Sequence, residues 1–512
     1  MTAPILLTDE QMQRFIAHGF LCLGTTLPPS YHRQVYERFD GLIGGDANLN
    51  PGNNLLPACP EIGAVLEDPI VIGALTSVLG PDYVMHPHRA LHNNVPGSPP
   101  QVLHKDSYWG YRGRVRNHRA RWAMVMYVPQ ATPLEQGPTG VVPGSQYQTR
   151  RPDEASQPEV AGALEQGGFL LIHYDVWHRK MKNLTQHKRF MMKFEFVRMT
   201  EPAAPTWNHA DPEWRLTDTP ALDMSAVWRR QWNWLRHAEA EKVPVQPGLD
   251  VAAGLGSHDR ETVLTTLNAM ARDGDAVAAH LESLFGLLAH PFDPVSTDTA
   301  YVIAAAGQSA VAGLLGVVLA NDGEHVDETN IAEQTLDYIP NRERIARAAT
   351  YGLIEIGAPA IPALLEMLAA GRSQTRKLAA YALGEIGVCT EDVAQALCAA
   401  ARDDALAVRV NAAESLAMMQ PTPNVVAALT AAVRDAEAEM RFTAALSLAR
   451  LGPSAETAVP ALGEALRDSN RYVPGYAVEA LERIGTREAT RALMPFLKQA
   501  RWCAHTSPAS IF

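Results

Sequence analysis

The feature that most constrains the fold is a twelve-residue motif in the C-terminal half, which occurs five times at intervals of 30, 33, 32 and 33 residues. Each copy is rich in Ala and Leu at helical spacing, and most end in Gly, which fits the left-handed position after a helix. The copies are ARAATYGLIEIG (346–357), RKLAAYALGEIG (376–387), RVNAAESLAMMQ (409–420), RFTAALSLARLG (441–452) and PGYAVEALERIG (474–485). A second apolar helix follows, as in PAIPALLEMLAAG. A period near 32 with two helices per unit predicts an α-solenoid.

An earlier helix pair, STDTAYVIAAAG and QSAVAGLLGVVLA, precedes a polar insertion around 321–345. Together these sequence segments, over roughly 290–500, resemble HEAT-like repeats of the short kind also seen in phycobilisome lyases. The resemblance implies a curved all-α surface that binds a protein partner, but the fold alone does not fix a role. The alternatives are an array that covers and stabilises the first half, or one that forms a homodimer. We disfavour a bilin-lyase role because the rest of the chain indicates different chemistry.

Charge and composition exclude several function classes. Residues 261–500 hold 30 acidic and 18 basic side chains, whereas residues 1–260 hold 26 and 25. An acidic array repels a phosphate backbone, so we expect no nucleic-acid partner. The sequence has no apolar run long enough to cross a bilayer and no recognisable secretory signal, so we expect no membrane association. The five cysteines are scattered without a C-x-x-C pair, which favours a reduced, cytoplasmic protein.

The N-terminal half has a different pattern. It opens with LTDEQMQRFIAHGFLCL, where Thr8 stands three residues before Gln11 as in a capping box. From about residue 83, short β-like runs alternate with connectors that contain Gly and Pro. These runs are QVLHKDSYWG, RWAMVMYVPQ, TGVVPGSQ, GFLLIHYDVWH and RFMMKFEFVRM. Many short strands behind a helical leader predict a β-sandwich or barrel-like core such as a jelly roll.

One polar pattern in these runs has the form of a metal site. His104 and Asp106 stand two apart in an extended run, so their side chains point to one face of a strand. His178 follows a buried strand, and Arg189 begins the next strand eleven residues later. Two histidines and one carboxylate with open positions form the facial triad of non-haem Fe(II) oxygenases. An arginine one strand further on suits the distal carboxylate of a dicarboxylate co-substrate.

With these residues in order, the chain from about 5 to 235 resembles the phytanoyl-CoA dioxygenase family of Fe(II)- and 2-oxoglutarate-dependent oxygenases. The likeness rests on LTDEQMQRFIAHGFLCL, LHKD, QGPTGVVPGSQ, the run from His178 to Arg189, and the late VWRRQWNWLR. It implies a double-stranded β-helix, or jelly roll, with flanking helices, and an enzyme that uses Fe(II), 2-oxoglutarate and O₂.

The resemblance also implies roles for individual residues. His104, Asp106 and His178 hold Fe(II) as the catalytic centre, and Arg189 binds the C5 carboxylate of 2-oxoglutarate. Further contacts to the co-substrate fall on two residues, each with a structural alternative as a core aromatic or a turn residue: Trp122 and Asn93.

Three positions depart from the pattern or compete with it. Gln146 replaces a histidine that is not a ligand in the family, so we expect little effect. Lys180 stands where several relatives have a small hydroxyl residue that contacts 2-oxoglutarate, which puts that contact in doubt. A second His-x-Asp, His173 with Asp175, aligns with a strand that carries no ligands and is left out.

The chemistry expected of such a site is the oxidative decarboxylation of 2-oxoglutarate to succinate and CO₂, with oxidation of an unactivated C–H bond. In related halogenases a small residue replaces the carboxylate ligand, so Asp106 favours hydroxylation over halogenation. Desaturation, epimerisation and cyclisation by the same site stay open. The expected substrate is a metabolite or natural-product intermediate.

A cluster of arginines directly after the metal pair is the one indication of substrate chemistry: Arg112, Arg114, Arg116, Arg119 and Arg121. They could bind an anionic substrate such as a carboxylate, a phosphate or a phosphopantetheine-linked acyl group. The alternative, which we favour, is a loop that is solvated or that docks on the acidic repeats.

The sequence therefore predicts a dioxygenase domain (1–240), a helical linker (241–290), a HEAT-like repeat domain (291–500) and a tail (501–512). The leading function is hydroxylation of a small molecule. The alternatives are an interaction scaffold with an inactive oxygenase half, or a protein-modifying oxygenase whose solenoid holds the target.

Overall fold

The computed structural model describes residues 3–43, 50–106, 114–115, 118–155, 157–239, 241–324 and 340–498. The chain divides into two compact units, residues 1–386 and residues 387–512. The division falls inside the repeat region, after α16 (Ser373–Ile386), so the first repeats belong to the same unit as the β-rich domain. Among the described residues, no helix combines the length and the apolar character that crossing a bilayer requires.

The first unit begins with a mostly helical leader, which contains one strand of the larger sheet. In α1 (Asp9–His18) the predicted capping box is present: the Gln11 backbone N–H donates to Thr8 Oγ1, and the Thr8 N–H donates to Gln11 Oε1. The leader continues through β1 (Phe20–Leu23) into four more helices, α2 (Pro29–Ile43), α3 (Leu55–Ala58), α4 (Ile62–Leu66) and α5 (Pro69–Leu79).

The larger sheet has five antiparallel strands in the order β1-β6-β3-β8-β2. Its remaining strands are β2 (Tyr83–Asn94), β3 (Trp122–Tyr127), β6 (Phe169–His173) and β8 (Arg189–Arg198). Strand β8 is buried along its whole length, between β3 and β2. Its phenylalanines share one face, and Phe190 packs there on Tyr36 and Phe39 of α2. The other face of β8 is therefore the inner face, and Arg189 lies on it.

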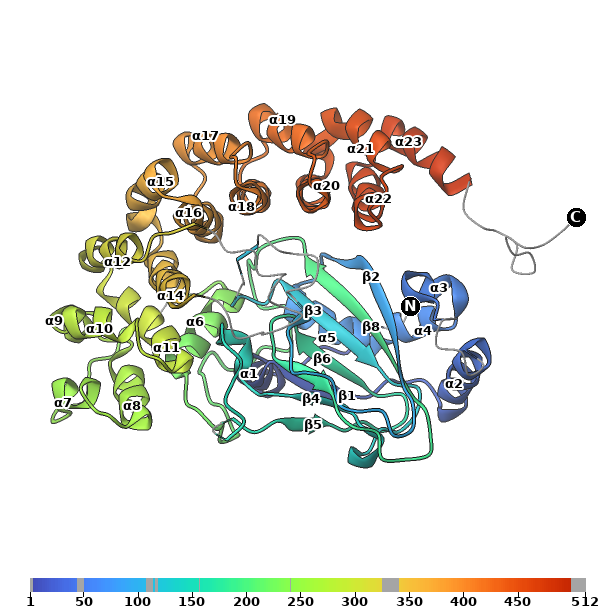
Figure 1. The fold of residues 1–512 in the computed structure, drawn as a ribbon, viewed down its shortest axis with the longest axis horizontal. Coiled ribbons are helices and arrows are strands. Elements are labelled where there is room, and N and C mark those ends of the chain that lie inside the picture. Colours follow the sequence, from blue (N-terminus) through green and yellow to red (C-terminus); the bar gives the residue numbers. More distant parts are fainter. Residues whose placement is uncertain are drawn as a thin grey trace, which may run out of the picture. The chain divides into compact units, whose positions relative to one another are not determined.

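A smaller sheet lies against this inner face. It contains β4 (Thr139–Val141), β5 (Val160–Gly162) and β7 (His178–Lys180), in the order β5-β4-β7. The Arg189 guanidinium of β8 donates to Thr139 Oγ1 of β4 at 3.0 Å, which joins the two sheets. Two antiparallel sheets facing each other across a buried interior, visible in Figure 1, confirm the predicted jelly-roll-like fold.

Helices complete the first unit. The aromatic helix α6 (Ser225–Arg236) packs on α1 and on the first repeat helix. Four short helices follow: α7 (Val251–Leu255), α8 (Arg260–Met270), α9 (Gly274–Ala279) and α10 (Leu281–Leu287). The repeat helices of this unit are α11 (Asp293–Ile303), α12 (Gln308–Ala320), α14 (Asn341–Ile356), α15 (Ile361–Ala370) and α16. Short 3₁₀ turns link several elements: η2 (Gly52–Asn54), η4 (Leu134–Gln136), η5 (Ser145–Tyr147), η6 (Ala304–Ala306) and η7 (Ala358–Ala360).

The second unit is helical throughout its described residues, 387–498. Its helices are α17 (Glu391–Ala400), α18 (Leu406–Leu416), α19 (Pro423–Ala432), α20 (Ala438–Leu451), α21 (Val459–Ala465), α22 (Tyr472–Ile484) and α23 (Arg487–Lys498), with a 3₁₀ segment η8 (Gly452–Ala458). Equivalent ion pairs recur from repeat to repeat, as Arg409 with Asp435 at 3.0 Å and Arg441 with Asp468 at 2.7 Å. Each pair ties the start of one helix to the turn of the next unit, which confirms the predicted helical repeats.

Candidate metal centre and co-substrate site

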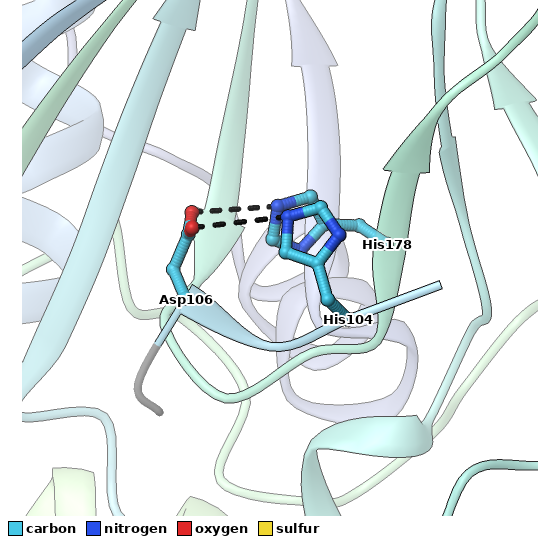
Figure 2. A group of neighbouring side chains, drawn as sticks. All are labelled: His104, Asp106 and His178. Atoms are coloured by element: carbon cyan, nitrogen blue, oxygen red, sulfur yellow. Dashed lines mark ion pairs between the residues drawn. The ribbon is translucent and has the colours of Figure 1, made fainter. Parts of the chain in front are cut away.

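The two candidate histidine ligands come from separate parts of the chain and meet through their backbones. His104 and His178 form an isolated antiparallel bridge, in which each N–H donates to the carbonyl of the other residue at 2.9 Å. Their imidazole centroids lie 4.7 Å apart. Asp106 follows two residues after His104, and its carboxylate points toward both rings (Figure 2).

The three side chains present donor atoms to one point. The donor atoms of His104, Asp106 and His178 all lie within 4.8 Å of one another. Nδ1 of His104 lies 2.9 Å from the Val102 carbonyl, and Nδ1 of His178 lies 3.1 Å from the Val176 carbonyl. Because a carbonyl only accepts, each Nδ1 carries the proton and each Nε2 is free to bind a metal.

The charge states of these side chains suit a divalent cation. Burial, with His178 as a further cause, lowers the pKa of His104 to about 4, so this ring is neutral near pH 7. Burial alone would raise the pKa of Asp106, but Lys193 and His178 hold that pKa well below its usual range. Two imidazoles and an ionised carboxylate with room for further ligands fit Fe(II). Among the described residues, this is the one group of His, Cys, Asp or Glu side chains placed to hold a metal.

A buried cation lies on the inner face of β8. Arg189 is 1% exposed, and its Nη2 donates to Thr139 Oγ1. Its Nε and Nη1 have no hydrogen-bond partner within the described part of the chain. Burial lowers the pKa of this guanidinium to about 10, so it remains charged at neutral pH. A buried cation with unused N–H donors favours an anionic partner, and the distal carboxylate of 2-oxoglutarate would supply one.

The structure does not bring Trp122 beside Arg189. Trp122 pairs with Val197, so it shares the inner face of β8 but lies eight residues from Arg189. At about 3.3 Å per residue this separation is roughly 26 Å along the strand. The Trp122 ring stacks on Tyr174 with centroids 5.1 Å apart, and the Arg114 guanidinium lies 4.7 Å from its centroid.

Asn93 does not meet Arg189 either. It pairs with Phe190, and residues paired directly across antiparallel strands point to the same face, here the face opposite Arg189. Its neighbour Asn94 pairs with Arg189 itself, but the Asn94 amide donates to the carbonyls of Gly137 and Met181. The predicted contact of Asn93 with the co-substrate therefore has no support from its placement.

The other positions noted in the sequence have structural partners. The Gln146 amide donates to the Ile16 carbonyl of α1 at 2.9 Å. His173 Nδ1 accepts the Asp175 backbone N–H at 3.1 Å, and this second His-x-Asp joins no metal-type group in the described part of the chain. Lys180 is half-buried in β7, two residues after His178.

The arginine cluster divides into different environments. Arg112 and Arg116 lie outside the described residues. Arg114 contacts Trp122, as stated above. Arg119 forms ion pairs of 3.3 Å with both Glu355 and Glu385, on the repeat helices α14 and α16. Arg121 pairs with Glu385 and, at 2.9 Å, with Glu201. For Arg119 and Arg121, docking on acidic residues of the first repeats is therefore the arrangement found, as favoured from the sequence.

The sequence analysis missed Lys193 and Glu195, two ionisable residues of β8 that lie beside the proposed metal ligands. Lys193 Nζ lies 2.9 Å from Asp106 Oδ2 and 3.3 Å from Glu195 Oε1. His86 Nδ1 of β2 lies 3.3 Å from the other Glu195 oxygen. The alternation of β8 could have revealed them, because every second residue after Arg189 points inward.

A jelly roll that carries two histidines, one carboxylate and a buried arginine defines the class of Fe(II)- and 2-oxoglutarate-dependent oxygenases. The family model described as phytanoyl-CoA dioxygenase (PhyH) matches residues 51–191, and the model for HEAT repeats matches residues 340–417 and 402–470. Residues 51–191 thus form a phytanoyl-CoA dioxygenase (PhyH) domain, the chain is an enzyme of this oxygenase type, and HEAT repeats follow at residues 340–470.

Comparison with solved structures returns several proteins described as non-heme enzymes, together with others whose descriptions give no activity. The non-heme monooxygenase ThoJ, in a nickel complex, is 16% identical, and the match covers 44% of this chain and 94% of ThoJ at a TM-score of 0.31. The alpha ketoglutarate dependent carbocyclase SnoK from nogalamycin biosynthesis is 14% identical, with coverages of 39% and 88% and a TM-score of 0.32. AviO1 from Streptomyces viridochromogenes Tue57 is 19% identical, with coverages of 40% and 100% and a TM-score of 0.31. The search of curated proteins returns no match.

Proposed function

We propose that this protein hydroxylates an unactivated C–H bond of a small molecule, with 2-oxoglutarate converted to succinate and CO₂. The observation that carries the proposal is the convergence of His104, Asp106 and His178 within 4.8 Å, on the inner side of a jelly roll whose β8 begins with the buried Arg189. The proposed substrate is a metabolite or natural-product intermediate.

In this proposal the chain's own residues bind and orient the reactants. The imidazoles of His104 and His178 and the carboxylate of Asp106 would hold Fe(II), which when bound supplies the activation of O₂ coupled to oxidative decarboxylation. Arg189 would bind the distal carboxylate of 2-oxoglutarate through its two unused N–H groups. His178, Asp106 and Arg189 are buried, whereas the side chain of His104 is 18% exposed.

Asp106 supports hydroxylation over halogenation. A carboxylate ligand occupies the position that a halide would need, and here that carboxylate is buried and paired with Lys193. Desaturation, epimerisation and ring closure would use the same residues, and analysis of the product distinguishes them from hydroxylation.

The test is succinate formation from 2-oxoglutarate under air, with added Fe(II) and ascorbate. Wild type should form succinate, even slowly and without substrate, and His104→Ala should not. His187→Ala, which removes an exposed histidine from the loop between β7 and β8, is the matched control and should behave as wild type. If wild type forms no succinate and also fails to bind Fe(II) and 2-oxoglutarate anaerobically, the proposal is wrong and a scaffold role replaces it.

A second candidate is an oxygenase that modifies a protein held by its repeats. The observation that favours it is that the described residues 387–498 form a compact helical unit of their own. Incubation of the enzyme with a proteome, followed by mass spectrometry, tests this function. A protein side chain that gains one oxygen atom with wild type but not with His104→Ala would favour it over the small-molecule reaction.

A further inference from the structure

A lysine–glutamate pair on the inner face of β8 touches the proposed metal centre. Lys193 and Glu195 are 5% and 2% exposed. Lys193 Nζ lies between two carboxylates, 2.9 Å from Oδ2 of Asp106 and 3.3 Å from Oε1 of Glu195. Lys193 therefore contacts the proposed iron ligand Asp106 directly, although it is not itself one of the three proposed ligands.

The strand holds this pair in a fixed place. Lys193 is paired with Met126 of β3 on one side and with Ala90 of β2 on the other. Glu195 is paired with Met124 of β3, and its second oxygen lies 3.3 Å from His86 Nδ1. A residue between two paired strands has little freedom to shift, so the ammonium group is presented to Asp106 from a rigid base.

The charges of the pair suggest a directional role. Buried charges persist only when they are paired, and Lys193 is paired with both Asp106 and Glu195. The lysine places an ammonium group directly beside Asp106. An ammonium at 2.9 Å engages one carboxylate oxygen, Oδ2, which also lies 3.4 Å from His178 Nε2, whereas Oδ1 lies 3.9 Å from His104 Nε2. A carboxylate can bind a metal through one oxygen or through both, and an engaged oxygen is less available to the metal.

We propose that Lys193, held by Glu195, is a positioning residue that keeps Asp106 a one-oxygen ligand and so preserves an open metal position for 2-oxoglutarate or O₂. This inference rests on the proposed function, because it concerns the same Fe(II) site. It assigns Lys193 no direct contact with substrate. Its effect reaches the reaction through the geometry of Asp106.

The test separates binding of the metal from binding of the co-substrate. Lys193→Met keeps the length of the side chain and removes the charge, and Lys193→Arg keeps a cation. The double variant Lys193→Met with Glu195→Gln also removes the buried carboxylate that would otherwise lose its partner. Lys188→Met is the matched control, because Lys188 forms a 2.7 Å pair with Asp40 near the start of the same strand.

Each protein is titrated anaerobically, first with Fe(II) and then with 2-oxoglutarate, which gives a charge-transfer absorbance on chelation. With Asp106 free to bind through both oxygens, both Met variants should bind Fe(II) at least as tightly as wild type. Their affinity for 2-oxoglutarate should fall about 10- to 100-fold, the usual range for residues that support metal ligands. Lys193→Arg should recover most of this loss, and Lys188→Met should match wild type.

The outcomes are distinguishable. If Fe(II) and 2-oxoglutarate affinities fall together, or neither changes in the double variant, Lys193 does not act on Asp106 as proposed and its role is structural. If wild type itself binds neither Fe(II) nor 2-oxoglutarate, the proposed function fails and the inference fails with it.

Discussion

Arg189 gives a prediction in which stability and binding change in opposite directions. This guanidinium is buried with one hydrogen bond, to Thr139, and burial lowers its pKa from 12.5 to about 10. At about 1.36 kcal/mol per pKa unit, keeping it charged costs the folded protein roughly 3 kcal/mol at pH 7. Arg189→Met removes the charge and nearly preserves the shape, so the variant should be more stable than wild type when no 2-oxoglutarate is present.

The same change should abolish most of the binding of 2-oxoglutarate. Truncating one partner of a buried charge pair costs about 2 to 5 kcal/mol, which corresponds to roughly 30- to 4,000-fold in affinity. Anaerobic thermal unfolding with Fe(II), with and without 2-oxoglutarate, measures both effects. Without 2-oxoglutarate, the midpoint of Arg189→Met should rise by up to roughly 5 °C. The rise that 2-oxoglutarate causes in wild type should be lost.

A matched control makes the comparison specific. Arg215→Met removes an arginine whose side chain is 67% exposed and paired with Glu213, so it should change neither midpoint. The reasoning is refuted if Arg189→Met lowers the stability of the protein without 2-oxoglutarate and still responds to 2-oxoglutarate as wild type does.

Three further predictions concern the surroundings of the site. Glu385→Gln leaves the buried Arg121 with only the half-exposed Glu201 as a partner, so its free energy of unfolding should fall by about 3 kcal/mol. Glu201→Gln should lower the free energy of unfolding by less than about 1 kcal/mol, and equal losses in the two variants would contradict this prediction. Burial lowers the pKa of His118 to about 3, so the unfolded chain binds a proton that the folded chain does not between pH 6.5 and 3, and stability should fall as pH drops through this window. His118→Phe should remove up to about 1.4 kcal/mol per pH unit of that slope between pH 6 and 5, and an unchanged slope would refute the assignment. Trp122→Phe should leave the affinity for 2-oxoglutarate unchanged, because roughly 26 Å of strand separates it from Arg189, and should alter only turnover with substrate; a loss of 2-oxoglutarate affinity would overturn this placement.

The sequence predicts the repeats and much of the grouping of His104, Asp106 and His178, because both depend on local patterns. A fixed period near 32 needs only helical propensity and neighbour stacking, and His104 and Asp106 need only the two-residue alternation of a strand. The meeting of His104 with His178 was expected from the facial-triad pattern and the family resemblance. A backbone bridge joins these two residues in the structure.

Features that depend on strand register or on distant contacts could not be read in this way. Asn93 and Asn94 are neighbours in sequence, yet a shift of one residue decides which of them faces Arg189. Trp122 was predicted to contact the co-substrate, but it lies beside the end of β8 far from Arg189, because the strand register is set by the whole sheet. Arg121 meets Glu385 across 264 residues, which no local pattern indicates.

The most direct test of the central claim is an anaerobic titration of the Fe(II)-loaded protein with 2-oxoglutarate, followed by absorbance, in wild type and in His178→Ala. The account predicts that wild type binds one Fe(II) and one 2-oxoglutarate, with the absorbance expected of a chelated keto acid, and that His178→Ala loses this absorbance. A wild type that binds 2-oxoglutarate without developing the absorbance, or a His178→Ala variant that develops it undiminished, would contradict the assignment of His104, Asp106 and His178 as the metal centre.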